Sequence, residues 1–105
     1  MSFLSSLFGK SNGRATHVSG LNARALVTDG AQLVDVRTPA EYTSGHVDGA
    51  TNIPLAVLPV RLHELDQGRA VVVYCRSGGR SASASGILSK AGFSDVYDMG
   101  AMSHW

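Results

Sequence analysis

The chain has 105 residues, of which 44% are hydrophobic and 16% charged, and its formal net charge is +1. This length and composition indicate one globular domain and argue against a disordered chain. The near-neutral charge creates no field that favours nucleic acid or a membrane surface. The only cysteine, Cys75, cannot form an intrachain disulfide, so the cysteine content gives no sign of an oxidising compartment.

The chain begins with a mildly apolar segment, Met1–Gly9, followed by a polar linker that contains glycine. Serines interrupt the apolar segment and no basic region precedes it, so it lacks the pattern of a secretory signal. No run approaches the roughly 20 apolar residues of a transmembrane helix. We therefore expect a flexible amino-terminal tail over residues 1–14, a single folded domain over residues 15–105, and a cytoplasmic protein. A role for Met1–Gly9 in docking to a partner or a membrane surface remains the alternative.

Short apolar runs predict five strands. The strongest is the fourth, because its continuous valines are typical of a strand that is covered on both faces. The first is a brief edge strand. In chain order the predicted strands are Thr16–Val18, Gln32–Val36, Ala50–Ile53, Ala70–Cys75 and Val96–Met99.

Helical patterns lie between these strands. Ser19 can cap the first helix, while Thr38, Pro39 and Glu41 form the start signal of the second, with a capping box. Pro59 delays the start of the third helix, since proline is tolerated only in the first turn. The predicted helices are Gly20–Thr28, Thr38–Gly45, Leu55–Asp66 and Ser81–Ala91. This alternation predicts an α/β fold with a parallel sheet, in which ligands bind beyond the carboxyl ends of the strands.

The segment after the strongest strand carries the candidate site. Arg76–Arg80 (RSGGR) forms a tight loop between Cys75 and a helix that begins near Ser81. Two adjacent glycines allow several backbone N–H groups to turn toward one anion, and the helix start and two arginines add positive charge. Such surroundings lower the pKa of a thiol, so we expect Cys75 to be largely thiolate at neutral pH. The alternative is an inert buried cysteine at the end of a strand.

Three motifs resemble the rhodanese (sulfurtransferase) family. They are LVDVRTPAEYTSGHVDGATNIPL at residues 33–55, CRSGGR followed by Ser81, and GFSDVYDMGAMSHW at residues 92–105. The resemblance implies a rhodanese-like five-stranded parallel sheet with helices on both faces. It also implies that Cys75 is the catalytic residue and accepts a sulfane sulfur. The substrate-binding residues that it implies are Arg76, Ser77, Gly78, Gly79, Arg80 and Ser81.

The last motif departs from the family pattern at two points. Ala101 stands where the family often has a second glycine, and the chain ends at Trp105, whereas the family tends to continue into a last helix. We expect Met102 and Trp105 to cover the core rather than to form a binding platform.

Four polar residues belong to the first motif: Asp35, Arg37, Glu41 and His46. We interpret them as structural, with Arg37 paired to Glu41 and Asp35 satisfying backbone N–H groups. A polar network at the mouth of the site is the alternative. The remaining histidines show no ligand spacing with Cys75 or with one another, so we expect neither a metal nor a cofactor.

The resemblance implies sulfur transfer from a small anionic donor, such as thiosulfate or a polysulfide, through a persulfide on Cys75 to a thiol or cyanide. One alternative is a phosphatase or arsenate reductase on the same fold. Cysteine phosphatases have five residues between cysteine and arginine, whereas four separate Cys75 from Arg80, and there is no second cysteine for the redox version. Another alternative is a non-enzymatic module that carries persulfide to a protein partner through the amino-terminal segment.

Overall fold

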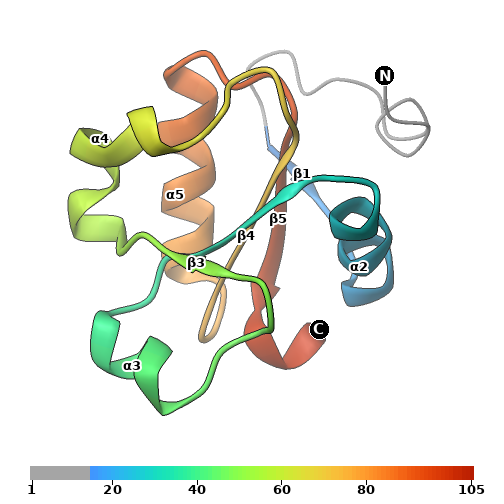
Figure 1. Cartoon of the computed structure of the whole chain (residues 1–105), viewed down its shortest axis with the longest axis vertical. Helices are drawn as coiled ribbons and strands as arrows, with labels where there is room; N and C mark the ends of the chain where they lie inside the picture. The colour runs from blue at the N-terminus through green and yellow to red at the C-terminus, as the bar shows by residue number, and fades with distance from the viewer. Residues whose placement is uncertain (1–14) are drawn as a thin grey trace.

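A five-stranded parallel sheet organises the part of the chain that this computed structural model describes, residues 15–105 (Figure 1). The strands lie in the order β1-β5-β4-β2-β3, and each neighbouring pair is parallel. Their bounds are β1 Thr16–His17, β2 Gln32–Asp35, β3 Thr51–Asn52, β4 Val71–Cys75 and β5 Val96–Ala101. The predicted strands are confirmed with ends that shift by one or two residues. The predictions for residues 1–14 lie outside the described residues.

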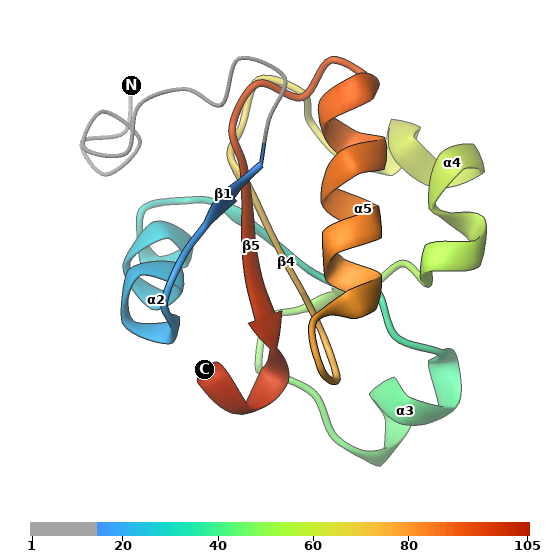
Figure 2. The same ribbon diagram turned by 180° about the vertical axis from the view of Figure 1, so that it is seen from behind.

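Helices cover both faces of the sheet, as Figures 1 and 2 show. Helix α2 lies on one face, and α4 and α5 lie on the other, while α3 lies beyond the edge toward which β5 points. The α-helices are α2 Gly20–Thr28, α3 Pro39–Ser44, α4 Leu58–Arg61 and α5 Gly79–Lys90. Short 3-10 turns are η1 Leu55–Val57, η2 Leu62–Glu64 and η3 Met102–His104. No helix within residues 15–105 is long and apolar enough to span a membrane.

The central strand β4 divides the core into two clusters. All five of its residues are buried, and successive side chains point to opposite faces. Val72 and Tyr74 belong to the cluster on the α2 side, whereas Val71, Val73 and Cys75 belong to the cluster on the α4 and α5 side. This burial on both faces explains why β4 is continuously apolar in the sequence.

The helix-start signals that the sequence predicts are confirmed. The Ser19 hydroxyl accepts a hydrogen bond from the backbone N–H of Asn22 at 3.1 Å. The hydroxyl of Thr38 accepts one from the N–H of Glu41, whose carboxylate accepts the N–H of Thr38 in return. This capping box fixes α3 and leaves part of the Glu41 carboxylate available for another partner.

Two helix predictions are corrected by the structure. The predicted helix Leu55–Asp66 is broken into η1, α4 and η2, since Pro59 lies in the first turn of α4 and has no N–H to continue the helix from η1. Helix α5 begins at Gly79, two residues earlier than predicted. Gly78 has a φ of +111°, so the chain turns sharply at this residue and enters the helix directly.

Candidate active site

Cys75 ends β4 at the carboxyl edge of the sheet and has no exposed surface (0%). Its partner in the register of the neighbouring strand is Ala101, at the end of β5. The ligand-binding edge of a parallel sheet is therefore where the thiol lies. The thiol is therefore covered from solvent in this structure.

The loop after Cys75 brings backbone N–H groups to the sulfur. The N–H of Gly78 donates a hydrogen bond to the Cys75 Sγ at 3.0 Å. Gly78 also precedes the first turn of α5, so the positive end of the helix dipole lies beside the same sulfur. These groups can stabilise a negative charge on the sulfur, while the binding of an anion by the loop stays a prediction.

Ser81 contributes a second group to the surroundings of the thiol. It is fully buried in the first turn of α5, and its hydroxyl donates to the carbonyl of Gly78 at 3.1 Å. Burial is the strongest influence on the pKa of Cys75 and raises it. Hydrogen bonds from the backbone and hydroxyl of Ser81, and from the backbone of Gly78 and Ser77, together lower this pKa below its ordinary value.

Arg80 does not stand free at the mouth of the site. Its guanidinium donates to both carboxylate oxygens of Glu41, at 2.6 and 3.0 Å. This bond raises the pKa of Arg80 and, as the largest cause, lowers the pKa of Glu41 to about 2. The negative charge of the Cys75 thiolate acts on Arg80 in the same direction as Glu41. The sequence analysis does not predict this pair. The capping box offered one signal for it, because it uses only one of the two carboxylate oxygens of Glu41.

The predicted pair between Arg37 and Glu41 is wrong, because Arg37 pairs with Asp35 instead. Both residues are buried, and the closest contact joins Arg37 Nη2 to Asp35 Oδ2 at 2.6 Å. The hydroxyl of Tyr74 donates to the same Asp35 carboxylate at 2.7 Å, and the backbone N–H of Val47 donates to Tyr74 at 3.1 Å. The Asp35 carboxylate also accepts the backbone N–H of Arg37, so its predicted structural role is confirmed.

The remaining loop residues face solvent. Arg76, Ser77 and Gly79 are exposed, and Arg76 makes no hydrogen bond or ion pair within residues 15–105. Arg76 is thus the loop cation without a carboxylate partner in the described part of the chain. Within the same residues no group of three or more histidine, cysteine or acidic side chains is placed to hold a metal ion.

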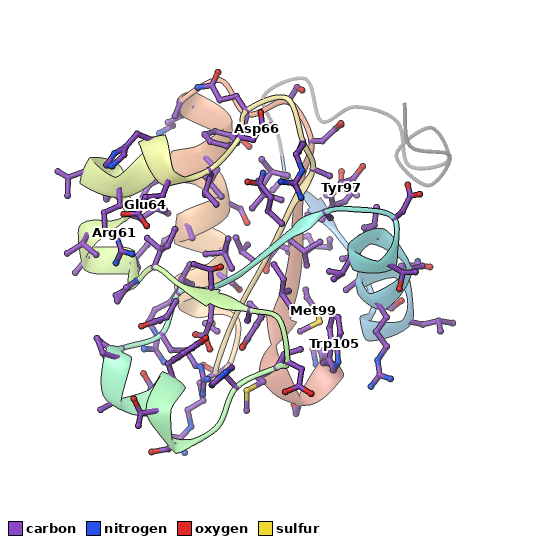
Figure 3. The ribbon with its side chains drawn as sticks, viewed as in Figure 1. Arg61, Glu64, Asp66, Tyr97, Met99 and Trp105 are labelled. Carbon is purple, nitrogen blue, oxygen red and sulfur yellow. The ribbon has the colours of Figure 1, made fainter. Side chains whose placement is uncertain are left out.

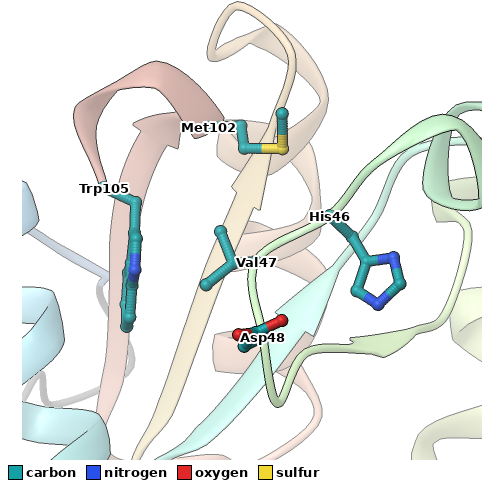
Figure 4. Close-up of a pocket in the computed structure, with 5 residues that line it drawn as sticks. All are labelled: His46, Val47, Asp48, Met102 and Trp105. Atoms are coloured by element: carbon teal, nitrogen blue, oxygen red, sulfur yellow. The ribbon is translucent and has the colours of Figure 1, made fainter.

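A shallow cavity of about 380 Å³, widely open to solvent, lies at the same edge of the sheet. Its lining residues come from the loop between α3 and β3 and from the carboxyl-terminal turn; they are His46, Val47, Asp48, Met102 and Trp105 (Figure 4). The His46 ring stacks on Tyr42, with 3.7 Å between ring centroids, and extends away from Val47. Met102 and Trp105 pack against the α2-side cluster, as predicted, and Figure 3 shows Trp105 close to Met99.

The chain is similar to several known proteins. The model of the rhodanese-like domain family matches residues 21–105. A sulfurtransferase of Allochromatium vinosum is 39% identical over 79 residues, which cover 75% of this chain and 74% of that relative. The thiosulfate sulfurtransferase PspE of Escherichia coli is 39% identical over 71 residues, covering 66% and 68%. Among solved structures, a rhodanese-related protein from Thermoplasma volcanium matches with a TM-score of 0.75 at 27% identity, covering 88% of this chain and 89% of that one.

Proposed function

Since this chain belongs to the rhodanese-like domain family, we propose that it is a sulfurtransferase that works through a persulfide on Cys75. The donor is a small anion that carries sulfane sulfur, such as thiosulfate, a polysulfide or a persulfide. The acceptor is a thiol or cyanide. We further propose that residues 15–105 form a single rhodanese domain and that residues 1–14 are an amino-terminal tail.

The first half of the reaction uses the Cys75 thiolate as the nucleophile. The sulfur Sγ attacks the outer sulfur of thiosulfate, and a new S–S bond forms between them. The bond between the outer sulfur and the sulfonate group breaks, and sulfite leaves with its electron pair. The enzyme keeps a persulfide anion on Cys75, so charge and atoms balance without a redox partner.

One observation carries this proposal, namely the hydrogen bond from the Gly78 N–H to the Cys75 Sγ at 3.0 Å. The same group and the first turn of α5 can stabilise a persulfide anion, which replaces the thiolate in the same cradle. Preorganised donors cost no reorganisation during the reaction, so they favour every anionic state of the cycle.

The two arginines of the loop have different proposed roles. Arg80 donates to the Glu41 carboxylate, so it positions the first turn of α5 rather than meeting the donor directly. Arg76 is exposed and without a carboxylate partner in residues 15–105, so it attracts the anionic donor toward the loop. These roles also argue against a phosphatase. Arg80 is the residue that comes nearest to the arginine of the cysteine phosphatases in spacing from the cysteine, and its guanidinium already donates to Glu41.

The full burial of Cys75 supports a second candidate function. A thiol with no exposed surface exchanges slowly with free small molecules, whereas a protein partner can hold the loop open while sulfur is passed. The alternative is therefore a persulfide relay to one protein partner. It differs from the first proposal in the acceptor and keeps the same Cys75 chemistry.

Intact mass spectrometry before and after incubation with thiosulfate tests the persulfide. We expect the wild type to gain the mass of one sulfur atom, to lose it on addition of cyanide, and to turn over in a thiosulfate:cyanide assay. Cys75→Ser serves as the matched control and should gain nothing. Failure of the wild type to gain sulfur from thiosulfate and from polysulfide alike would refute the proposal, whereas loading without turnover would favour the relay.

A further inference from the structure

Asp98 in β5 is a buried carboxylate that has no role in the steps described above. It is only 2% exposed, and its register partner in β4 is Val73, which belongs to the core cluster on the α4 and α5 side. Register partners in a parallel pair point to the same face of the sheet, so Asp98 lies on the face that also holds Cys75. Burying a carboxylate is costly unless it is well partnered, so its presence here calls for a physical reason.

The side chain of Asp98 lies at a β-bulge. Val73 is aligned with Asp98. The next residue of β4, Tyr74, is aligned with Gly100, so β5 contains one additional residue, Met99. Asp98 Oδ1 accepts a hydrogen bond from the N–H of Gly100 at 2.8 Å, across this additional residue. Gly100 has a φ of +81°, a backbone conformation that other residues rarely adopt. The carboxylate therefore fixes the shape of the bulge.

This bulge supports the loop that follows Cys75. Beyond it, β5 continues to Ala101, which is the register partner of Cys75. Gly78 lies so close to Gly100 that a Cβ on Gly78 would be 4.0 Å from the Gly100 Cα, an ordinary van der Waals contact. The N–H of the same Gly78 donates to the Cys75 Sγ at 3.0 Å. The path from the Asp98 carboxylate to the sulfur thus runs through the backbone of Gly100 and Gly78.

We propose that Asp98 is a positioning residue for the sulfur of Cys75. Its carboxylate holds the bulge of β5 in one shape, and Gly100 in turn keeps the Gly78 N–H where it donates to Sγ. Asp98 acts through the backbone rather than by contact with the reacting atoms. The inference rests on the proposed persulfide only for the rate of sulfur loading, because the hydrogen bond to the sulfur is present before any donor arrives.

Two properties of Asp98 have to be separated, its negative charge and its hydrogen-bond acceptor. The other carboxylate oxygen, Oδ2, lies 3.8 Å from Nδ1 of His17, whose side chain is 86% exposed. Asparagine removes the charge but keeps an oxygen that can accept the Gly100 N–H, whereas alanine removes both. A buried negative charge disfavours a second one nearby. Loss of the charge should therefore lower the pKa of the Cys75 thiol, and loss of the acceptor should raise it.

The test measures the pKa of Cys75 in Asp98→Ala and in Asp98→Asn, from the ultraviolet absorbance of the thiolate as a function of pH. Cys75 is the only cysteine, so the signal belongs to one thiol, and Cys75→Ser gives the baseline. Asp66→Ala is the matched control, because Asp66 Oδ1 accepts the N–H of Gly68 at 2.8 Å, again two residues further on. Asp66 precedes β4, at the end of the sheet away from Met99 (Figure 3).

We expect Asp98→Ala to lower the ionisation constant of the thiol by about two- to ten-fold, the factor that corresponds to one hydrogen bond. This variant should also take up sulfur from thiosulfate more slowly. Asp98→Asn should keep or increase the ionisation constant, and Asp66→Ala should leave it unchanged. An unchanged pKa of Cys75 in Asp98→Ala, or an equal rise in Asp98→Asn, would overturn the positioning role.

Urea unfolding shows whether each variant is folded. If Asp98→Ala is not, Gly100→Ala replaces it, since a side chain at a φ of +81° strains the same bulge while Asp98 stays in place. An unchanged pKa of Cys75 in that variant overturns the proposal in the same way. A wild type that takes up no sulfur from thiosulfate or polysulfide refutes the proposed function instead. The pKa comparison uses no donor, so it still decides the role of Asp98.

Discussion

The carboxylate of Glu41 in α3 accepts hydrogen bonds from both terminal nitrogens of Arg80 in α5, at 2.6 and 3.0 Å. One of its oxygens also accepts the N–H and hydroxyl of Thr38. The start of α3 and the first turn of α5 are thereby joined through one side chain. The loop above Cys75 is held between this junction and the end of β5.

Replacing Glu41 with glutamine should remove an acid-dependent part of the stability. Arg80 lowers the pKa of Glu41 from 4.5 to about 2, so the folded state releases this proton more readily than the unfolded state. The resulting stabilisation is complete above about pH 4.5 and is lost as the pH falls toward 2. Urea unfolding at a series of acidic pH values measures it. The free energy of unfolding of the wild type should therefore approach that of Glu41→Gln as the pH falls from 4.5 toward 2. A difference between the two that stays constant over this range would contradict the prediction.

Removing the Ser81 hydroxyl should raise the pKa of the Cys75 thiol. That hydroxyl is one of the groups that offset the effect of burial, and the others belong to the backbone and remain in Ser81→Ala. The rate of alkylation by iodoacetamide as a function of pH gives the thiol pKa. Ser83→Ala is the matched control, because Ser83 lies two residues further along the same helix and its side chain is exposed. Coincident pH profiles for Ser81→Ala and the wild type would show that the hydroxyl does not face the sulfur.

Alanine at position 78 should destabilise the loop, and alanine at position 79 should not. Gly78 has a φ of +111°, which costs a residue with a side chain about 1–3 kcal/mol. A Cβ at this position would meet the Gly100 Cα at an ordinary 4.0 Å, so the cost is backbone strain rather than a clash. Gly79 lies in α5 with open space around it. Urea unfolding of both variants at neutral pH separates the two effects.

The rate at which the two glycine variants take up sulfur should follow the same order as their free energies of unfolding. A strained Gly78→Ala shifts the N–H that donates to Cys75, so its persulfide should form more slowly than in Gly79→Ala. If the Gly78 variant unfolds and loads like the wild type, the positive φ is not required for the site.

The parts of this fold that the sequence predicted are those with a local physical signal. The caps at Ser19 and Thr38 and the apolar run of β4 depend on residues close together in the chain, and each appears where predicted. The loop at Cys75 belongs to this class as well, because its glycines and the following helix are contiguous. Even there the predicted helix start at Ser81 is two residues late, since the low helix propensity of glycine favours a loop at Gly79.

The contacts that the sequence did not predict join distant segments. Glu41 and Arg80 are 39 positions apart, and the hydroxyl of Tyr74 meets the N–H of Val47 across 27 positions. No periodicity relates such residues, and the sequence therefore favours the carboxylate of Glu41 in the helix as the partner of Arg37 instead of Asp35. Burial decides this choice, because Asp35 is fully covered and requires a charged partner, whereas Glu41 is partly exposed and has Arg80.

Alanine at position 20 should displace the carboxyl-terminal turn and with it the Trp105 wall of the cavity. Gly20 is buried at the start of α2, and a Cβ there would lie 1.6 Å from the carbonyl oxygen of His104. The backbone fixes the positions of both atoms, so the clash is removed only when η3 or α2 moves. We expect this movement to lower the free energy of unfolding by about 1–3 kcal/mol or more. Trp105 is the only tryptophan of the chain, so its fluorescence reports the movement directly.

Gly86→Ala provides the comparison for this variant. Gly86 lies inside α5, and a Cβ there meets nothing within 4 Å, so alanine should stabilise the helix by about 0.5–1 kcal/mol. We expect Gly20→Ala to change the emission of Trp105 and to lower the midpoint of urea unfolding, and Gly86→Ala to leave the emission unchanged and to raise the midpoint. Since Arg24 donates to the carbonyl of Trp105, Arg24→Ala should shift the emission in the same direction as Gly20→Ala but by less. An unchanged Trp105 emission in Gly20→Ala would mean that α2 yields rather than the turn, and the cavity would then keep its wall.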